Sequence, residues 1–141
     1  MVAAAVQDEK AVPFGLVVSG EANDYVEALR QIVGPEWLVT YRVRDEGEVL
    51  EVVRAGLADA AVLDEEVTRV DTLKLLRTIR RLNEGMLVVL LTGHTDRRWL
   101  EEALRLAAFS VVTKPLRLEE LLIQIHRMMV RLDAAIRGGR F

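Results

Sequence analysis

The segment Ala60-Ala-Val-Leu-Asp64 is an unbroken apolar run that ends in a carboxylate. Four further short apolar runs lie before and after it, separated by longer segments with helical periodicity. These runs are residues 14–18, 37–43, 87–91 and 110–113. Short apolar runs that alternate with helices are typical of βα units wound around a parallel sheet. We therefore expect an α/β fold, with a five-stranded parallel sheet and helices on both of its faces.

The polarity of each run predicts its place in the sheet. Residues 37–43 alternate between apolar and polar side chains, which is typical of an edge strand. The other four runs are apolar throughout, and we expect them to be buried on both faces. Among the helices, the first is expected to begin at an N-cap formed by Asn23 or Asp24 and to stop at Gly34. The fourth is expected to turn a stripe that includes Leu100 and Leu104 toward the sheet.

The composition of the 141-residue chain excludes several classes of protein. Apolar residues make up 51% of the chain, enough for one aliphatic core. A net charge of −3 provides no positive field for nucleic acid, so we expect no direct nucleic-acid partner. The absence of cysteine excludes disulfides and thiolate metal sites. No uncharged stretch approaches the roughly 20 residues of a membrane helix, and no signal peptide is evident, so the expected location is cytoplasmic, with no membrane partner.

Polar residues follow four of the predicted strands. Ser19 and Gly20 follow the first strand, Asp64 the third, Thr92 the fourth and Lys114 the fifth. The carboxyl ends of parallel strands lie at one edge of a sheet, where ligands bind, so these side chains are expected to converge. Three of them, Asp64, Thr92 and Lys114, are suited to phosphoryl transfer to a carboxylate. Asp64 would be the nucleophile, Thr92 would donate to a phosphoryl oxygen and Lys114 would neutralise its charge.

These motifs resemble the receiver domain of two-component response regulators, over about residues 13–133. Leu63-Asp64 resembles the family's phospho-acceptor position, Leu91-Thr92-Gly93 its hydroxyl step, and Thr113-Lys114-Pro115-Leu116 its lysine-proline step. The resemblance implies a flavodoxin-like, doubly wound sheet with strand order 2-1-3-4-5 and a cis bond before Pro115. It also implies a sensor histidine kinase or a phosphotransfer protein as partner.

The acidic residues depart from the family pattern. Family members hold Mg²⁺ with two adjacent acidic residues after the first strand, where this chain has Ser19 and Gly20. The candidate metal ligands that remain are Glu21, Asp64 and Glu66. Mg²⁺ requires near-octahedral oxygen ligation, so we expect its binding to be weak or absent. Phosphorylation at Asp64 is then expected to be inefficient or silent, because the metal supplies much of the stabilisation in such transfers.

Three functions remain open. The chain is either a receiver that accepts phosphate on Asp64, or a pseudo-receiver that acts only through protein–protein binding. A small-molecule enzyme is disfavoured, because the strand ends carry no paired base and no cofactor motif. A nucleotide-binding P-loop is excluded, because Gly20 is followed by Glu21 and Ala22 where that motif requires Lys and then Ser or Thr. His94 has no partner identifiable from sequence, and we assign it no chemistry.

An interface is expected on the face formed by the fourth helix, the fifth strand and the fifth helix. Trp99 and Leu106 lie seven residues apart, offset from the stripe expected to face the sheet. They either form an exposed ridge or pack on a neighbouring loop or helix. Val111 takes the place of the family's switch aromatic. Because the family uses this face for dimers and output contacts, the resemblance favours an interface containing Trp99, Leu106 and Val111, including a homodimer.

The chain is expected to hold one domain with short ends. Residues 1–11 are predicted to be disordered or extended, and residues 12–133 to form the receiver-like domain. Residues 134–141 are predicted to be a C-terminal tail or a linker stub.

Overall fold

The computed structural model describes residues 13–67, 71–94 and 96–138 of the chain. The expectation for residues 1–11 lies outside this part. A parallel sheet has the strand order β2-β1-β3-β4-β5, which confirms the predicted fold class and order. Its strands are β1 (Phe14–Val18), β2 (Leu38–Arg42), β3 (Ala60–Asp64), β4 (Leu87–Thr92) and β5 (Ser110–Thr113).

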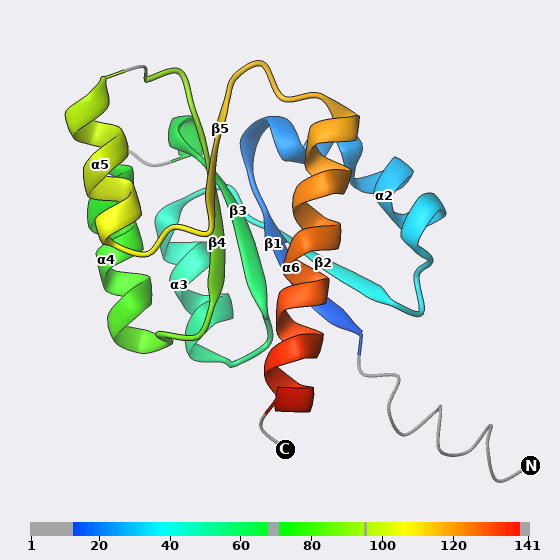
Figure 1. The fold of residues 1–141 in the computed structure, drawn as a ribbon. Coiled ribbons are helices and arrows are strands. Elements are labelled where there is room, and N and C mark those ends of the chain that lie inside the picture. The colour runs from blue at the N-terminus through cyan, green and yellow to red at the C-terminus, as the bar shows by residue number, and fades with distance from the viewer. Residues whose placement is uncertain (1–12, 68–70, 95, 139–141) are drawn as a thin grey trace, which may run out of the picture.

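Helices cover both faces of the sheet, and each face has its own apolar core. Figure 1 shows α2 and α6 on one side, and α3, α4 and α5 on the other. The α-helices are α2 (Val26–Val33), α3 (Glu46–Arg54), α4 (Thr72–Leu82), α5 (Arg97–Arg105) and α6 (Leu118–Gly138). The short 3-10 helices are η1 (Gly20–Tyr25) and η2 (Glu65–Val67). No helix in the described ranges combines the length and apolarity that crossing a membrane requires.

Aspartates fix the starts of three helices on the α3–α5 side. The carboxylates of Asp45, Asp71 and Asp96 accept hydrogen bonds from backbone N–H groups in the first turns of α3, α4 and α5. Such caps satisfy donors that have no partner within the helix. The predicted cap of α2 is wrong, because Asn23 and Asp24 lie inside η1, which leads directly into the helix. Gly34, with φ of 101°, ends α2 as predicted.

Two predictions of burial are wrong. β5 is an edge strand and only Val112 is buried in it, although its uniformly apolar sequence predicted burial on both faces. Ala103 of the stripe predicted to face the sheet is buried, but Leu104 is 62% exposed, whereas Trp99 of α5 and Leu106 directly after it pack against the core. Trp99, Ala103 and Leu106 also recur at helical spacing, so the sequence contains two competing stripes, and α5 buries the one with the larger side chains.

The last helix carries much of the core on its face of the sheet. Leu121, Ile125 and Met128 of α6 are buried against β1, β4 and α2 residues of the same cluster. The backbone of α6 remains helical to Gly138, past residue 133, the predicted end of the domain. The first residues of the predicted tail therefore continue the helix.

Candidate functional site

Asp64 lies at the centre of the carboxyl edge of the sheet and is fully buried. Its Oδ1 accepts hydrogen bonds from Lys114 Nζ at 2.8 Å and from the N–H of Glu66 at 3.0 Å. Its Oδ2 accepts from the N–H of Glu21 at 2.9 Å. A buried carboxylate is stable only when charge and hydrogen bonds replace its lost hydration. Both carboxylate oxygens of Asp64 therefore have hydrogen-bond partners in place of water.

Lys114 joins Asp64 to two other carboxylates. Its Nζ lies 3.0 Å from Glu66 Oε1 and 3.2 Å from Glu21 Oε2, in addition to its contact with Asp64. Burial of the Lys114 side chain opposes its charge, but hydrogen bonds to Asp64, Glu66 and Glu21 outweigh burial and raise its pKa. The cis peptide bond between Lys114 and Pro115 matches the isomer that the resemblance implied.

Ser19 and Gly20 fill the positions next to Asp64 with structural contacts. The Ser19 hydroxyl is fully buried, donates to the carbonyl of Val62 at 2.9 Å and accepts from the N–H of Asp64 at 2.9 Å. It therefore joins β1 to β3. Gly20 has φ of 55°, and a Cβ there would overlap the Asp64 carboxylate. An acidic side chain at Gly20 is incompatible with this arrangement.

The donor set around Asp64 does not fit the Mg²⁺ ion that the fold family implies. The three carboxylates predicted as ligands, those of Glu21, Asp64 and Glu66, converge on the Lys114 ammonium, so a positive group already lies among them. Mg²⁺ takes oxygen ligands in near-octahedral geometry, and here the three carboxylates are directed at an ammonium group instead. In the described ranges, no group of three His, Cys, Asp or Glu side chains is arranged to hold a metal ion.

Thr92 lies at the same edge but binds a different carboxylate. Thr92 is fully buried, and its hydroxyl donates to Glu65 Oε2 at 2.8 Å. The N–H of Gly93 donates to the other oxygen of Glu65, Oε1, at 2.7 Å. Burial of Glu65 opposes ionisation, but these hydrogen bonds and the nearby His94 and Lys114 outweigh it and lower its pKa. The structure thus gathers Asp64, Thr92 and Lys114 as predicted, with Glu65 bound to the threonine.

Sequence reasoning missed the roles of Glu65 and His94. The sequence predicts no role for Glu65, although its position directly after Asp64 is an available signal. His94 Nε2 lies 3.4 Å from Glu65 Oε2, and its ring stacks on Trp99 with centroids 5.0 Å apart. Trp99, Leu106 and Val111, the residues of the predicted interface, are each half-buried against the α3–α5 core. Their role in an interface remains a prediction.

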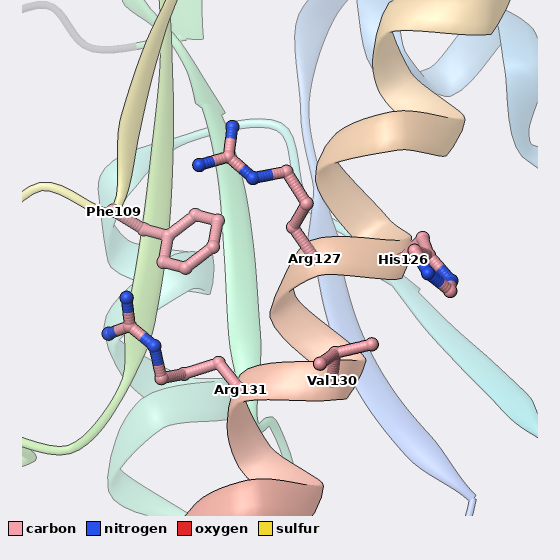
Figure 2. A pocket seen from close by; sticks show the side chains of 5 residues that line it. All are labelled: Phe109, His126, Arg127, Val130 and Arg131. Atoms are coloured by element: carbon pink, nitrogen blue, oxygen red, sulfur yellow. The ribbon is translucent and has the colours of Figure 1, made fainter.

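A separate hollow lies toward the amino ends of the strands. It has a volume of about 410 Å³ and lies between α6 and Phe109, the residue before β5. Figure 2 shows Arg127 and Arg131 reaching from α6 toward the Phe109 ring, while His126 points away from it. The guanidinium carbons lie 5.7 and 5.3 Å from the ring centroid, within cation–π range. This hollow is at the end of the sheet opposite Asp64.

Comparisons with known proteins agree with this geometry. MprA, a response regulator of Mycobacterium leprae, is 30% identical over 127 residues, which are 90% of this chain and 50% of that protein. Sporulation initiation phosphotransferase F of Bacillus subtilis is 20% identical over 93 residues, 66% of this chain and 75% of that protein. A CheY-like response regulator receiver domain protein of Methanospirillum hungatei has a similar fold, with a TM-score of 0.74 and 18% identity over 87% of this chain and 98% of that one.

The chain spans about half the length of the MprA proteins that it matches. The family model described as the response regulator receiver domain matches residues 17–126, which include Asp64, Thr92 and Lys114. This match covers most of the chain, and the strand order and the contact between Asp64 and Lys114 are consistent with it. The chain therefore belongs to the response regulator receiver domain family.

Proposed function

We propose that this receiver domain acts in two-component phosphorelay signalling with Asp64 as its phospho-acceptor position, and that its Mg²⁺-dependent phosphorylation is weakened or absent. The contact of 2.8 Å between Lys114 Nζ and Asp64 Oδ1 carries the proposal. It joins a carboxylate nucleophile to a cation at the edge of the sheet where ligands bind. The domain is a signalling module in this proposal, and not an enzyme.

The phosphoryl donor would be a phosphohistidine of a sensor kinase or of a phosphotransfer protein. An oxygen of Asp64 would attack phosphorus, and the phosphorus–nitrogen bond would break with its electron pair left on the imidazole. The product would be an acyl phosphate on Asp64. Lys114 would neutralise charge on the phosphoryl oxygens, and Thr92 would donate a hydrogen bond to one of them. Both side chains are at the same edge of the sheet as Asp64.

The charges around Asp64 support the weakened form of this reaction. A phosphoryl group brings close to two negative charges at neutral pH. Glu21 and Glu66 already share the Lys114 ammonium with Asp64, and Glu65 holds the Thr92 hydroxyl. The incoming group would therefore compete for its cation and for its hydroxyl donor. Ser19 and Gly20 supply no carboxylate for a metal ion that could offset this repulsion.

The alternative function is a pseudo-receiver that binds protein partners without phosphorylation. The hydrogen bonds of Glu65 to Thr92 and Gly93 favour it, because they already supply an anion to the donors that a phosphoryl group would use. For either function, we place a partner, or a second copy of the chain, on the face formed by α5, β5 and α6. Light scattering during gel filtration tests the homodimer, which requires a mass of twice the monomer.

The experiment that tests the proposed function is labelling by acetyl phosphate, a small phosphoryl donor, followed by intact mass spectrometry. Wild type is compared with Asp64→Asn, both with and without Mg²⁺. We expect slow labelling that needs Asp64 and changes little with Mg²⁺. Labelling that Mg²⁺ accelerates by orders of magnitude would overturn the weakened metal dependence. A complete lack of labelling, also with a histidine phosphodonor, would replace the proposed function by the pseudo-receiver.

A further inference from the structure

The carboxylate of Glu65 is bound by two donors at once. Oε2 accepts from the Thr92 hydroxyl at 2.8 Å, and Oε1 accepts from the N–H of Gly93 at 2.7 Å. Both distances are short, as expected for hydrogen bonds to an ionised acceptor. Thr92 is fully buried, and its only hydroxyl proton is used in this contact. The two donors therefore form a small anion-binding pair, and a side chain of the same chain occupies it.

The same two donors adjoin the group that the proposed function modifies. Glu65 directly follows Asp64 in the sequence, and β4, which ends at Thr92, pairs with β3, which ends at Asp64. A phosphoryl group on Asp64 would present anionic oxygens to this edge of the sheet. A carboxylate also offers two anionic oxygens, so it satisfies a hydroxyl and an N–H in the way that two phosphoryl oxygens would.

The bound carboxylate is also connected to the face expected to bind partners. His94 follows the two donors, and its N–H donates to the Thr92 hydroxyl oxygen at 2.9 Å. Its Nε2 lies 3.4 Å from Glu65 Oε2, and its ring stacks on Trp99 of α5. Contacts therefore run without a break from Glu65, through Thr92 and His94, to the half-buried Trp99. A change at the carboxylate would be transmitted to α5 by these contacts.

We propose that Glu65 is an internal substitute for the phosphoryl group, which holds Thr92, Gly93 and His94 in their anion-bound arrangement while Asp64 is unmodified. This inference rests on the proposed function in taking Thr92 as the phosphoryl contact. It adds a form of regulation to the site: the loop after β4 is engaged without a phosphate, and any phosphoryl group on Asp64 must displace Glu65. In the unmodified receiver, the loop after β4 therefore already has the conformation in which an anion is bound.

The first test is amide and indole NMR of the full chain with no phosphodonor present. The variants are Glu65→Ala and Glu65→Gln, and the matched control is Glu66→Gln, which removes the neighbouring charge but contacts Lys114 and neither Thr92 nor Gly93. We expect the Gly93 and His94 amides and the Trp99 indole to move several times further in the Glu65 variants than in the control. Equal movement in the control and in the Glu65 variants would overturn the inference.

The second test is binding of beryllofluoride, which forms a phosphoryl mimic on an aspartate. Releasing a charged hydrogen-bond acceptor from the two donors is expected to tighten binding to Glu65→Ala by at least about tenfold relative to wild type. Equal affinity in the two proteins would overturn the displacement of Glu65. If neither protein binds beryllofluoride at tens of millimolar Mg²⁺ and neither is labelled at Asp64 by acetyl phosphate, the acceptor role of Asp64 fails, while the Gly93 comparison still decides the role of Glu65. The two failures are therefore distinguishable.

Discussion

Replacing Lys114 with methionine is expected to destabilise the protein more than any other lysine substitution in the described ranges. The variant keeps most of the side-chain volume and removes the cation shared by Asp64, Glu21 and Glu66. Asp64 is fully buried and the Lys114 side chain is only 12% exposed, so water cannot replace the lost charge. At 2.8 Å the Coulomb attraction of one such pair is about 6 kcal/mol for an effective dielectric constant of about 20.

Part of that attraction is offset by desolvation of the two ions. Removal of one partner of a buried pair lowers the free energy of unfolding by about 3 to 5 kcal/mol. Glu66 adds little, because its side chain is 72% exposed. For a chain of 141 residues this loss corresponds to a fall in Tm of about 10 to 15 °C.

The assay is urea unfolding followed by circular dichroism, supported by calorimetry. The matched control is Lys74→Met, because Lys74 is exposed on α4 and makes no ion pair within the described ranges. In an Asp64→Asn background, Lys114→Met is expected to lose about 1 to 3 kcal/mol less than in wild type, because the two residues are coupled. If Lys114→Met is no more destabilising than Lys74→Met, the buried ion pair does not stabilise the site and our reasoning is wrong.

Three further predictions concern neighbouring contacts. Gly20→Ala is expected to lower the free energy of unfolding by several kcal/mol, because its Cβ would overlap Asp64. Gly56→Ala has open space around the new Cβ and should lose only about 1 kcal/mol, from its positive φ of 68°. Chemical denaturation of the two variants measures the difference. Arg80→Ala removes a guanidinium that donates to the carbonyls of Glu84 and Met86 before β4 and of Leu106 and Ala107 after α5. It should cost about 1 to 3 kcal/mol, against almost nothing for the exposed Arg81→Ala. The contacts of Glu65 lower its pKa in the folded state below the ordinary value of 4.5. The stabilisation that its carboxylate provides is therefore complete above pH 4.5 and is lost as the pH falls through the pKa of the folded state. In urea unfolding, the stability difference between wild type and Glu65→Gln should therefore shrink as the pH falls below 4.5, and a constant difference would contradict this prediction.

Strands and topology could be predicted because aliphatic runs leave few alternatives. Residues 14–18 and 60–64 form β1 and β3, which are buried on both faces as their composition requires. The same rule failed for β5, because an edge strand covered by helices can be as apolar as a central one. The strand order itself came from family resemblance, since composition cannot distinguish a central strand from such an edge.

The convergence of the candidate residues could be predicted because topology alone brings the carboxyl ends of the strands together. Asp64 and Lys114 are 50 positions apart in sequence and in direct contact, as their places at the end of β3 and directly after β5 require. The partner of Thr92 could not be predicted in this way. It depends on the conformation of η2, which turns Glu65 toward β4, and a propensity for turns does not specify that direction.

The orientation of α5 shows a second limit. Two stripes on this helix have apolar spacing, one with Leu100 and Leu104 and one with Trp99 and Leu106. The choice between them depends on the volume available next to the sheet, and the larger Trp99 is half-buried there while Leu104 remains exposed. Periodicity gives the angle between stripes, whereas packing decides which of them faces inward.

Titration of the isotope-labelled full chain with Mg²⁺, followed by amide NMR, tests most directly whether the acceptor site has lost its divalent cation. We predict that the amides of Ser19, Gly20 and Glu21 stay in place through tens of millimolar Mg²⁺, because the Lys114 ammonium lies among the available carboxylates. Saturable movement of these amides together with that of Asp64 would show a functional metal site and would contradict the account.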